Sequence, residues 1–245
     1  MTGGTILITG AASGIGLATA QALAPAADRL ILVDRDADAL AAVALPCSVD
    51  LLPGDVADED FWVLAAPFLG GLTQAVINAG VAGAGAIAGL EFAEWRRILS
   101  VNLDGAFLTL RAAMRAIDGP GAIVAVTSAA GIKAEPGIAA YAASKAGLIQ
   151  LVRVAAKEGA LRRLRVNAIA PAGVETPVWD AVPMFAGRVA EVGRDAAFAE
   201  LAEAATPLGR FAKPDEIARQ IAFLLSDDAA LITGSVLVSD GGYTL

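Results

Sequence analysis

The chain contains no histidine and only one cysteine among its 245 residues. Histidine is the commonest proton carrier near neutral pH, and histidine and cysteine are the usual zinc ligands. We therefore expect no metal site, and acid–base chemistry has to use tyrosine, lysine or a carboxylate. Tyrosine is scarce too, since only Tyr141 and Tyr243 occur. The lone Cys47 cannot form a disulfide within the chain, which favours a reducing compartment and predicts a cytoplasmic protein.

Long apolar runs are also missing, although 56% of the residues are hydrophobic. Charged residues such as Arg111, Arg153 and Lys157 interrupt every long stretch, so we expect no membrane span. The first ten residues carry no basic region followed by an apolar run, so we expect no export signal. The net charge of −8 repels a phosphate backbone, which argues against a nucleic-acid partner.

Short runs rich in β-branched residues alternate with helical stretches, as in repeated strand–helix–strand units. Strands are predicted at 5–9, 29–34, 73–78, 122–128, 165–170 and 235–238, with a further strand leading into Asp55. The pattern predicts one α/β domain over residues 1–245. We expect a Rossmann-type, doubly wound parallel sheet of about seven strands in three layers, α/β/α.

The segment over residues 176–207 departs from this alternation. It contains Pro177 and Pro183 together with two bulky residues, Trp179 and Phe185, that we expect to be exposed. A long interruption late in an α/β chain is often a lid or a binding loop. We predict a substrate-binding loop or lid here, with both aromatic side chains in the substrate pocket.

A glycine-rich turn follows the first predicted strand and precedes a predicted helix over 17–24. Glycine lets the backbone approach a pyrophosphate closely, and a helix N-terminus offers unpaired N–H groups and a partial positive charge. Ser13 is placed either to cap the helix or to contact a phosphate, and a tight turn for helix packing would use similar residues. We predict a dinucleotide cradle made by Gly10, Ser13, Gly14, Ile15 and Gly16.

Asp34 ends the second predicted strand, 24 residues beyond Gly10. A carboxylate at that place can accept hydrogen bonds from the ribose hydroxyls of NAD, and its charge repels the 2'-phosphate of NADP. The adjacent Arg35 weakens this argument, and an exposed aspartate that only opens a turn is the alternative. We predict NAD as the cofactor.

Tyr141 and Lys145 are four residues apart in a stretch predicted to be helical, so they lie on one helix face. A free tyrosine titrates near pH ~10, and a nearby ammonium lowers that pKa by stabilising the phenolate. Ser128 ends a predicted strand, at the edge where open α/β sheets bind ligands. A Tyr/Lys pair alone is usually a solvated face, and a serine alone is an ordinary loop start. Together they predict proton transfer at a substrate oxygen.

The ordered set of motifs resembles the short-chain dehydrogenase/reductase family, in its shorter NAD(P)-binding subclass, over nearly the whole chain. The residues that carry the resemblance are 9–16 (TGAASGIG), 55–56 (DV), 78–80 (NAG), 101–102 (VN), Ser128, Tyr141 with Lys145, and 167–171 (NAIAP). The chain departs from the family pattern at Ile77, where many relatives have asparagine, and at Ala172, where glycine usually follows the proline.

The resemblance implies a role for each matching position. Tyr141 would be the general acid in reduction and the base in oxidation, Lys145 would lower its pKa and bind the nicotinamide ribose, and Ser128 would orient the substrate oxygen. Asn102 resembles a helix-interrupting asparagine that holds a water linking the lysine to solvent. The cofactor would further contact Asp55 and Val56 at the adenine, Asn78, Ala79 and Gly80 at the adenosine ribose, and Pro171, Val174 and Thr176 near the nicotinamide.

We therefore predict an NAD-dependent oxidoreductase that interconverts a secondary alcohol and a ketone by hydride transfer at a CH–OH group. Two alternatives stay open. The first is an NAD(P)H-dependent 3-oxoacyl thioester reductase, with Lys133 and the basic cluster at 162–165 as candidate entrance residues, although that cluster also suits a solvated helix end. The second is a non-catalytic dinucleotide sensor. The family implies a homo-oligomer, a dimer or a homotetramer, formed through the helices after Asn102 and around Tyr141.

Overall fold

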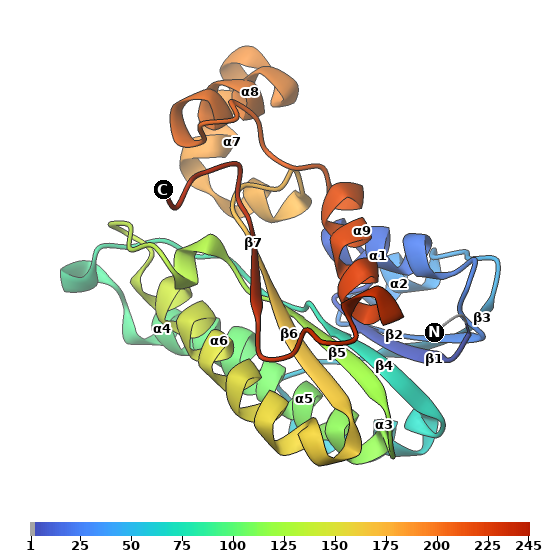
Figure 1. Ribbon diagram of the computed structural model, residues 1–245. Coiled ribbons are helices and arrows are strands. Elements are labelled where there is room, and N and C mark those ends of the chain that lie inside the picture. The colour runs from blue at the N-terminus through green and yellow to red at the C-terminus, as the bar shows by residue number, and fades with distance from the viewer. Residues whose placement is uncertain (1–2) are drawn as a thin grey trace.

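The computed structural model describes residues 3–245, apart from the side chains of Ala181 and Pro183, and within this range a seven-stranded parallel sheet forms the centre (Figure 1). The strands are β1 Thr5–Thr9, β2 Arg29–Asp34, β3 Ser48–Pro53, β4 Leu72–Ile77, β5 Gly121–Val126, β6 Leu164–Pro171 and β7 Val236–Ser239. Their order is β3-β2-β1-β4-β5-β6-β7, so the direction of winding reverses between β1 and β4. Open sheets of this kind bind ligands at the carboxyl ends of the strands beside that reversal.

Helices cover both faces of the sheet. Among the described residues the α-helices are α1 Gly14–Leu23, α2 Ala37–Ala41, α3 Glu59–Ala65, α4 Phe92–Leu99, α5 Ala106–Ala116, α6 Ala139–Gly159, α7 Pro183–Val192, α8 Arg194–Ala205 and α9 Pro214–Leu225. Figure 1 shows α1, α2 and α9 on one face and α3, α5 and α6 on the other. Within residues 3–245, no helix combines the length and the apolar character needed to cross a membrane.

The three layers follow from the period-two pattern of the strands. Successive side chains of a strand point to opposite faces, so a strand buried on both faces is apolar at every position. In β1, Leu7 packs with the α3, α5 and α6 layer, whereas Ile6 and Ile8 pack with the α1, α2 and α9 layer. All three side chains are buried. The predicted Rossmann-type α/β fold is confirmed.

The strand predicted over 122–128 ends early, at Val126. Ser128 becomes the N-cap of the 3₁₀ turn Ala129–Gly131, and its Oγ accepts a hydrogen bond from the Ala130 N–H at 3.1 Å. The Thr127 N–H still donates to the Ile169 carbonyl oxygen of β6 at 2.8 Å, and the capped turn begins directly after it. The strand stops, and Ser128 is left at the carboxyl edge of the sheet.

The segment over residues 176–207 folds as a 3₁₀ turn, Pro177–Ala181, followed by α7 and α8. Figure 1 shows α7 and α8 beyond the end of β6, standing apart from the other helices. The expectation that Trp179 and Phe185 are exposed is wrong: Phe185 has 0% of its surface exposed, and Trp179 is partly buried. Both rings pack into a separate hydrophobic cluster, because the segment builds a small core of its own.

Candidate active site

The ends of β1 and β4 are joined by a closed set of hydrogen bonds. The Thr9 Oγ1 accepts from the Asn78 N–H at 3.0 Å and from the Ala79 N–H at 3.2 Å. The Asn78 side-chain amide donates to the Thr9 and Gly10 carbonyl oxygens, at 3.0 and 3.1 Å. Asn78 therefore clamps the glycine turn. Thr9 was not among the predicted site residues, and its signal in the sequence is a polar residue that ends an otherwise apolar strand.

The glycine turn leaves no room for side chains at two of its positions. A Cβ at Gly16 would overlap the Gly10 carbonyl oxygen, and Gly14 has a φ of +52° that side chains rarely adopt. Ser13 is the N-cap residue of α1 but makes no capping hydrogen bond through its side chain, and it is exposed. Ser13 therefore does not cap α1 through its side chain in this structure, and its hydroxyl is open to a ligand. The turn therefore has the shape and the donors that a pyrophosphate requires.

Asp34 connects the end of β2 to the glycine turn. One carboxylate oxygen accepts from the Ala12 N–H at 2.9 Å, and the other accepts from the Asp36 N–H at 3.1 Å. Asp34 is thus fixed at the cradle in addition to opening a turn. Its negative charge therefore lies at the end of β2, beside the glycine turn.

Asp55 and Val56 follow β3 at the next corner of the same edge. The Asp55 carboxylate accepts from the Ala57 N–H at 2.8 Å, which fixes the turn. Val56 is buried, and its carbonyl oxygen accepts from the Trp62 indole N–H at 2.9 Å. The cradle, Asp34 and this turn together line one half of the carboxyl edge.

Ser128 and Tyr141 meet in the other half. Their hydroxyls are hydrogen-bonded to each other, and Ser128 comes from the end of β5 while Tyr141 comes from the first turn of α6. Because the Ser128 Oγ accepts from a backbone N–H, its proton is available for the Tyr141 oxygen. Two hydroxyl groups therefore face one point at which a substrate oxygen can bind.

Lys145 lies one helical turn beyond Tyr141 and is 4% exposed. Its Nζ donates to the Val126 carbonyl oxygen at 3.0 Å and lies 5.7 Å from the centre of the Tyr141 ring. Burial of the ammonium lowers the pKa of Lys145 to about 8. At neutral pH this lysine can therefore give up and recover a proton at little cost.

The pKa of Tyr141 departs from its ordinary value in the direction opposite to the one expected. Burial of the hydroxyl raises it, and the hydrogen bond from Ser128 lowers it by less. Lys145 does not reverse this shift, because its ammonium is directed to the Val126 carbonyl oxygen. Tyr141 is therefore protonated at neutral pH.

Asn102 occupies the middle of a π-helical turn, Ser100–Gly105, that interrupts the helix between α4 and α5. Its amide oxygen accepts from the Val81 N–H at 2.8 Å, and its NH₂ group donates to the Val81 carbonyl oxygen at 2.9 Å and to the Ser144 hydroxyl at 3.2 Å. Ser144 in turn donates to the Tyr141 carbonyl oxygen at 2.7 Å. The side chain of Asn102 therefore anchors the helix turn that carries Tyr141. Ser144 was missed because a serine inside a helix has no distinctive pattern.

Gly80 lies close to Asn102 and Lys145. A Cβ on Gly80 would come within 3.3 Å of the Asn102 amide oxygen and 3.4 Å of the Lys145 Nζ. The 78–80 stretch therefore runs from the cradle, which Asn78 clamps, to the catalytic residues.

The loop after β6 carries Pro171, Val174 and Thr176. Thr176 is buried, and it lies against the start of α1, since a Cβ on Gly14 would come within 3.2 Å of its Cγ2. Val174 pairs with Ala212 in an isolated parallel bridge. This loop closes the carboxyl edge between the cradle and the 176–207 segment.

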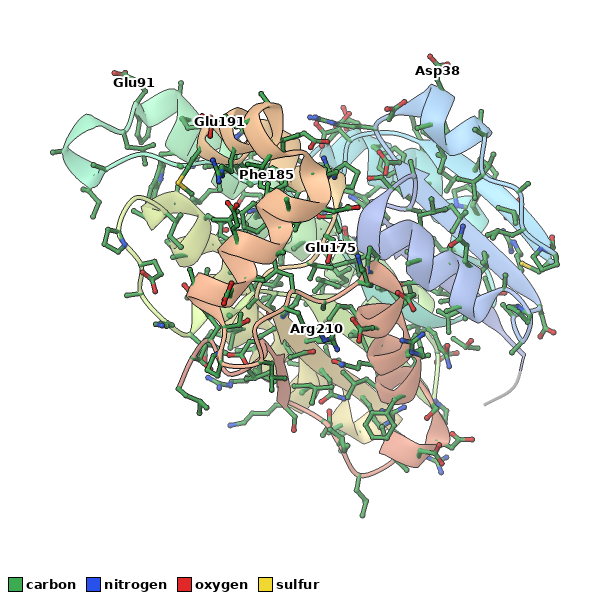
Figure 2. The ribbon with its side chains drawn as sticks, turned by 90° about the horizontal axis from the view of Figure 1, so that it is seen from above. Asp38, Glu91, Glu175, Phe185, Glu191 and Arg210 are labelled. Carbon is green, nitrogen blue, oxygen red and sulfur yellow. The ribbon has the colours of Figure 1, made fainter. Side chains whose placement is uncertain are left out.

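Two side chains attach the 176–207 segment to that loop. The Trp179 indole N–H donates to the Val174 carbonyl oxygen at 2.9 Å, and an Arg194 Nη donates to the Thr176 carbonyl oxygen at 3.1 Å. Arg194 also forms an ion pair with Asp180. Figure 2 shows the molecule from above. Helix α7, on which Phe185 is labelled, lies in this view between Glu91 on the left and Asp38 on the right. The segment thus lies across the region above the sheet edge.

The structure places Trp179 and Phe185 inside the segment. The Trp179 ring stacks on Phe211 at a centroid distance of 5.5 Å, and the Phe185 ring lies 4.5 Å from Phe198. Phe185 has no exposed surface to offer a ligand in this arrangement. The side chains of Val178 and Met184 are 43% and 68% exposed and are better placed for contact with a ligand.

The basic residues considered for an acyl-carrier entrance are already engaged. Lys133 forms an ion pair with Glu135 at 3.6 Å and donates to the Tyr243 carbonyl oxygen at 2.8 Å. Arg162 donates to two carbonyl oxygens at the C-terminal end of α5, and Arg165 donates to three at the C-terminal end of α9. The basic cluster therefore caps two other helices, where cations are favoured.

Surface hollows elsewhere do not involve the predicted site residues. One of about 410 Å³ lies between α7 and α8, and another of about 400 Å³ lies between α3 and α5. The described residues contain no group of three histidine, cysteine, aspartate or glutamate side chains that could hold a metal ion. The candidate site is therefore defined by the converging hydroxyls and the cradle.

Comparison with known proteins gives consistent matches over almost the entire chain. A family model described as enoyl-(acyl carrier protein) reductase matches residues 10–244. Cis-4-hydroxycyclohexanecarboxylate dehydrogenase of Sinomonas cyclohexanicum is 39% identical, over 97% of this chain and 95% of the relative. The 3-oxoacyl-(acyl-carrier-protein) reductase FabG of Thermotoga maritima is 36% identical, over 99% of this chain and 98% of the relative.

A solved structure agrees with these sequence matches. The crystal structure of levodione reductase superposes with a TM-score of 0.87 at 33% identity, covering 98% of this chain and 97% of that one. The similarity extends over both the cradle and the catalytic half.

Proposed function

Because the chain belongs to the short-chain dehydrogenase/reductase family, we propose that it is an NAD-dependent oxidoreductase that interconverts a secondary alcohol and a ketone, with Tyr141 as the acid–base residue. The observation that carries this proposal is the hydrogen-bonded pair of Ser128 and Tyr141 hydroxyls beside Lys145, whose burial lowers its pKa to about 8. A lysine with a pKa near neutral pH, next to the protonated hydroxyl of Tyr141, is suited to acid–base catalysis near neutral pH.

The proposed proton steps use these residues in turn. In reduction, Ser128 donates a hydrogen bond to the ketone oxygen while Tyr141 transfers its proton to that oxygen. Lys145, one turn away, restores the charge balance by supplying a proton to Tyr141. In oxidation the same steps run in reverse, with Tyr141 accepting the alcohol proton. Asn102 keeps the helix turn of Tyr141 and Lys145 in place.

The cradle residues at 9–16 would hold the pyrophosphate, with the adenosine side toward Asp34, Asp55 and Val56 and the nicotinamide side toward Thr176. When bound, the nicotinamide supplies or accepts the hydride, so the protein needs no redox group of its own. The Asp34 carboxylate supports NAD over NADP, because a 2'-phosphate would face its negative charge. A comparison of kcat/KM for the two cofactors tests this, and a preference for NADP would contradict it.

We propose that the 176–207 segment is the lid over the substrate. Its two attachments, Trp179 to Val174 and Arg194 to Thr176, join it to the loop that would hold the nicotinamide. The exposed side chains of Val178 and Met184 then offer an apolar surface to the substrate. A mainly apolar contact surface favours a hydrophobic alcohol or ketone.

The substrate proposal is tested by a panel of secondary alcohols with NAD, with NADH formation followed by absorbance. The panel should begin with cis-4-hydroxycyclohexanecarboxylate, because a dehydrogenase named for it is 39% identical to this chain. Turnover of an alcohol in the panel supports the proposal. NADH binding without turnover of any alcohol or ketone would favour the sensor instead.

A second candidate is an NADPH-dependent 3-oxoacyl thioester reductase, favoured by the 36% identity to FabG of Thermotoga maritima over nearly both chains. Two observations argue against it. Asp34 opposes the 2'-phosphate, and Lys133, at the entrance, is engaged by Glu135 and by the chain end. Faster reduction of a 3-oxoacyl thioester with NADPH than of any simple ketone with NADH would select this candidate.

We also propose that the protein is a homo-oligomer that associates through α5 and α6. Phe107 on α5 is 45% exposed and Val154 on α6 is 44% exposed, and a second copy of the chain would cover both. Light scattering of the purified protein tests this, and a monomeric mass at micromolar concentration would contradict it.

A further inference from the structure

The last six residues of the chain, 240–245, fold back into a compact turn. The Asp240 carboxylate accepts hydrogen bonds from the Gly242 N–H at 2.9 Å, from the Thr244 N–H at 2.8 Å and from the Thr244 hydroxyl at 2.7 Å. Gly241 and Gly242 have φ angles of +63° and +89°, which side chains rarely adopt. Figure 1 shows this dark red end rising from β7 to a position below α7 and α8.

One side of the turn contacts the chain that leaves α8. The Leu208 N–H donates to the Gly241 carbonyl oxygen at 3.0 Å, and a Cβ on Gly242 would come within 2.9 Å of the Pro207 ring. The 206–210 stretch is itself joined to α8, since the Thr206 hydroxyl donates to the Ala202 carbonyl oxygen at 2.9 Å. The C-terminal turn is therefore connected to the end of the proposed lid.

The other side of the turn contacts the loop 129–138, which joins Ser128 to α6. The Lys133 ammonium donates to the Tyr243 carbonyl oxygen at 2.8 Å and lies 4.3 Å from the centre of the Tyr243 ring. The Tyr243 hydroxyl donates to the Glu135 carboxylate, and this bond together with burial raises the pKa of Tyr243 to about 12. Tyr243 is thus held through its carbonyl group, its ring and its hydroxyl.

The loop 129–138 is connected to Ser128 by backbone hydrogen bonds. The Lys133 N–H donates to the Ala129 carbonyl oxygen at 2.9 Å, and the Gly131 N–H donates to the Ser128 carbonyl oxygen at 2.9 Å. Lys133 therefore closes the helical turn that begins at Ser128. A shift of the Lys133 backbone has to move this turn, and with it the hydroxyl that faces Tyr141.

We propose that residues 240–245 form a strap that couples the end of the lid to the Ser128 loop, and that Lys133, Glu135 and Tyr243 are positioning residues for the alcohol. The inference rests on the proposed function for its substrate. The strap contacts neither the cradle nor Asp34, so it acts on the alcohol and leaves the dinucleotide unaffected. Small displacements of a catalytic group are costly, since about 1 Å can reduce the rate by about a hundredfold.

The kinetic test compares Tyr243→Ala and Lys133→Met with Leu245→Ala. Leu245 belongs to the same segment, but its side chain is 100% exposed, which makes it a matched control. We expect the first two variants to raise the KM for the alcohol about fivefold or more, with the KM for NAD within twofold of wild type. The effect of the double variant should be smaller than the sum of the two single effects, because both variants remove the contact between the Lys133 ammonium and the Tyr243 ring. A KM for the alcohol that stays at the wild-type value in both single variants overturns the positioning role.

Hydrogen exchange provides a readout that does not require turnover. Tyr243→Ala should speed amide exchange both in 129–138 and in 206–210, whereas Leu245→Ala should leave both segments as in the wild type. Unchanged exchange in the two segments overturns the strap. If the wild-type protein oxidises no alcohol, the proposed function fails, and the exchange result by itself still decides whether the strap couples these segments.

Discussion

The proposed cradle at residues 9–16 and the proposed lid at residues 176–207 are held by different kinds of interaction. The cradle consists of small residues whose backbone is fixed by side chains. The Thr9 hydroxyl and the Asp34 carboxylate accept from backbone N–H groups, and the Asn78 amide donates to backbone carbonyl oxygens. Side chains are excluded from its inside, because a Cβ there would meet another part of the backbone. The cradle therefore has one geometry.

The lid is held by side chains. Phe185, Phe198 and Trp179 form its core, and ion pairs such as Arg188 with Glu200 lie on its surface. Exposed ion pairs contribute little, so the aromatic core supplies most of the lid's stability. Two hydrogen bonds, from Trp179 and from Arg194, connect the segment to the loop after β6.

This difference separates two tasks. A rigid cradle suits a cofactor that is the same in every turnover. A lid with its own core would be able to change the surface that contacts the substrate without changing the cofactor site. Variants that affect one region should leave the other region intact. The following predictions test that separation, beginning with the largest effect.

Phe185→Ala should loosen the lid and leave the cradle intact. Removal of a fully buried phenylalanine costs about 3–5 kcal/mol, and here the loss falls on the lid's own unfolding free energy. Hydrogen exchange should show loss of protection in α7 and α8 with an unchanged Kd for NADH. Met184→Ala, beside it and 68% exposed, is the control. Equal loss of protection in α1 would show that the two regions are one cooperative unit.

Gly16→Val should disturb the cradle and leave the lid intact. Its Cβ would overlap the Gly10 carbonyl oxygen, and overpacking of about 1–3 kcal/mol corresponds to about 5- to 150-fold weaker NADH binding. Fluorescence titration with NADH measures this. Gly187→Ala on α7, where a Cβ meets nothing within 4 Å, should bind NADH like the wild type. Normal affinity in Gly16→Val would contradict the assignment of the cradle.

Asp34→Ser should change which dinucleotide the cradle selects. Loss of the carboxylate removes a charged hydrogen-bond acceptor, and such bonds contribute about 1.5–3 kcal/mol. The ratio of kcat/KM for NAD to that for NADP should fall by about tenfold or more. Steady-state kinetics with both cofactors measures the ratio. An unchanged ratio would assign Asp34 to the turn alone.

The pH dependence tests Lys145, which lies between the two regions. Oxidation needs a neutral lysine to receive the proton that Tyr141 takes from the alcohol, and burial lowers the pKa of Lys145 to about 8. Oxidation at saturating NAD should therefore rise about tenfold between pH 7 and pH 9, and ketone reduction should fall over the same range. A flat profile in both directions would remove Lys145 from the proton path.

The sequence was most informative where chemistry depends on neighbours along the chain. Tyr141 and Lys145 share a helix, the cradle is one continuous turn, and the two-sided apolar strands predict the sheet. The predicted ends of the strands were less reliable where a side chain caps the following turn, as Ser128 does after β5.

Contacts between distant parts of the chain could not be predicted. Trp179 looked exposed because its stacking partner Phe211 lies 32 residues further on. Lys133 looked like an entrance residue because its partner Tyr243 lies 110 residues away. The pKa of Tyr141 depends on burial, which the spacing to Lys145 does not reveal. In each case the packing of the folded chain decides what a side chain does.

Tyr141→Phe tests the central claim most directly, because it removes one hydroxyl and keeps the ring. Acid–base catalysis by a positioned group contributes about 10²- to 10⁴-fold, so turnover of the best alcohol found in the panel should fall by about that factor. The Kd for NADH, measured on the same preparation, should stay within twofold of the wild-type value. Turnover that stays within a few-fold of wild type, with NADH bound normally, would contradict the account.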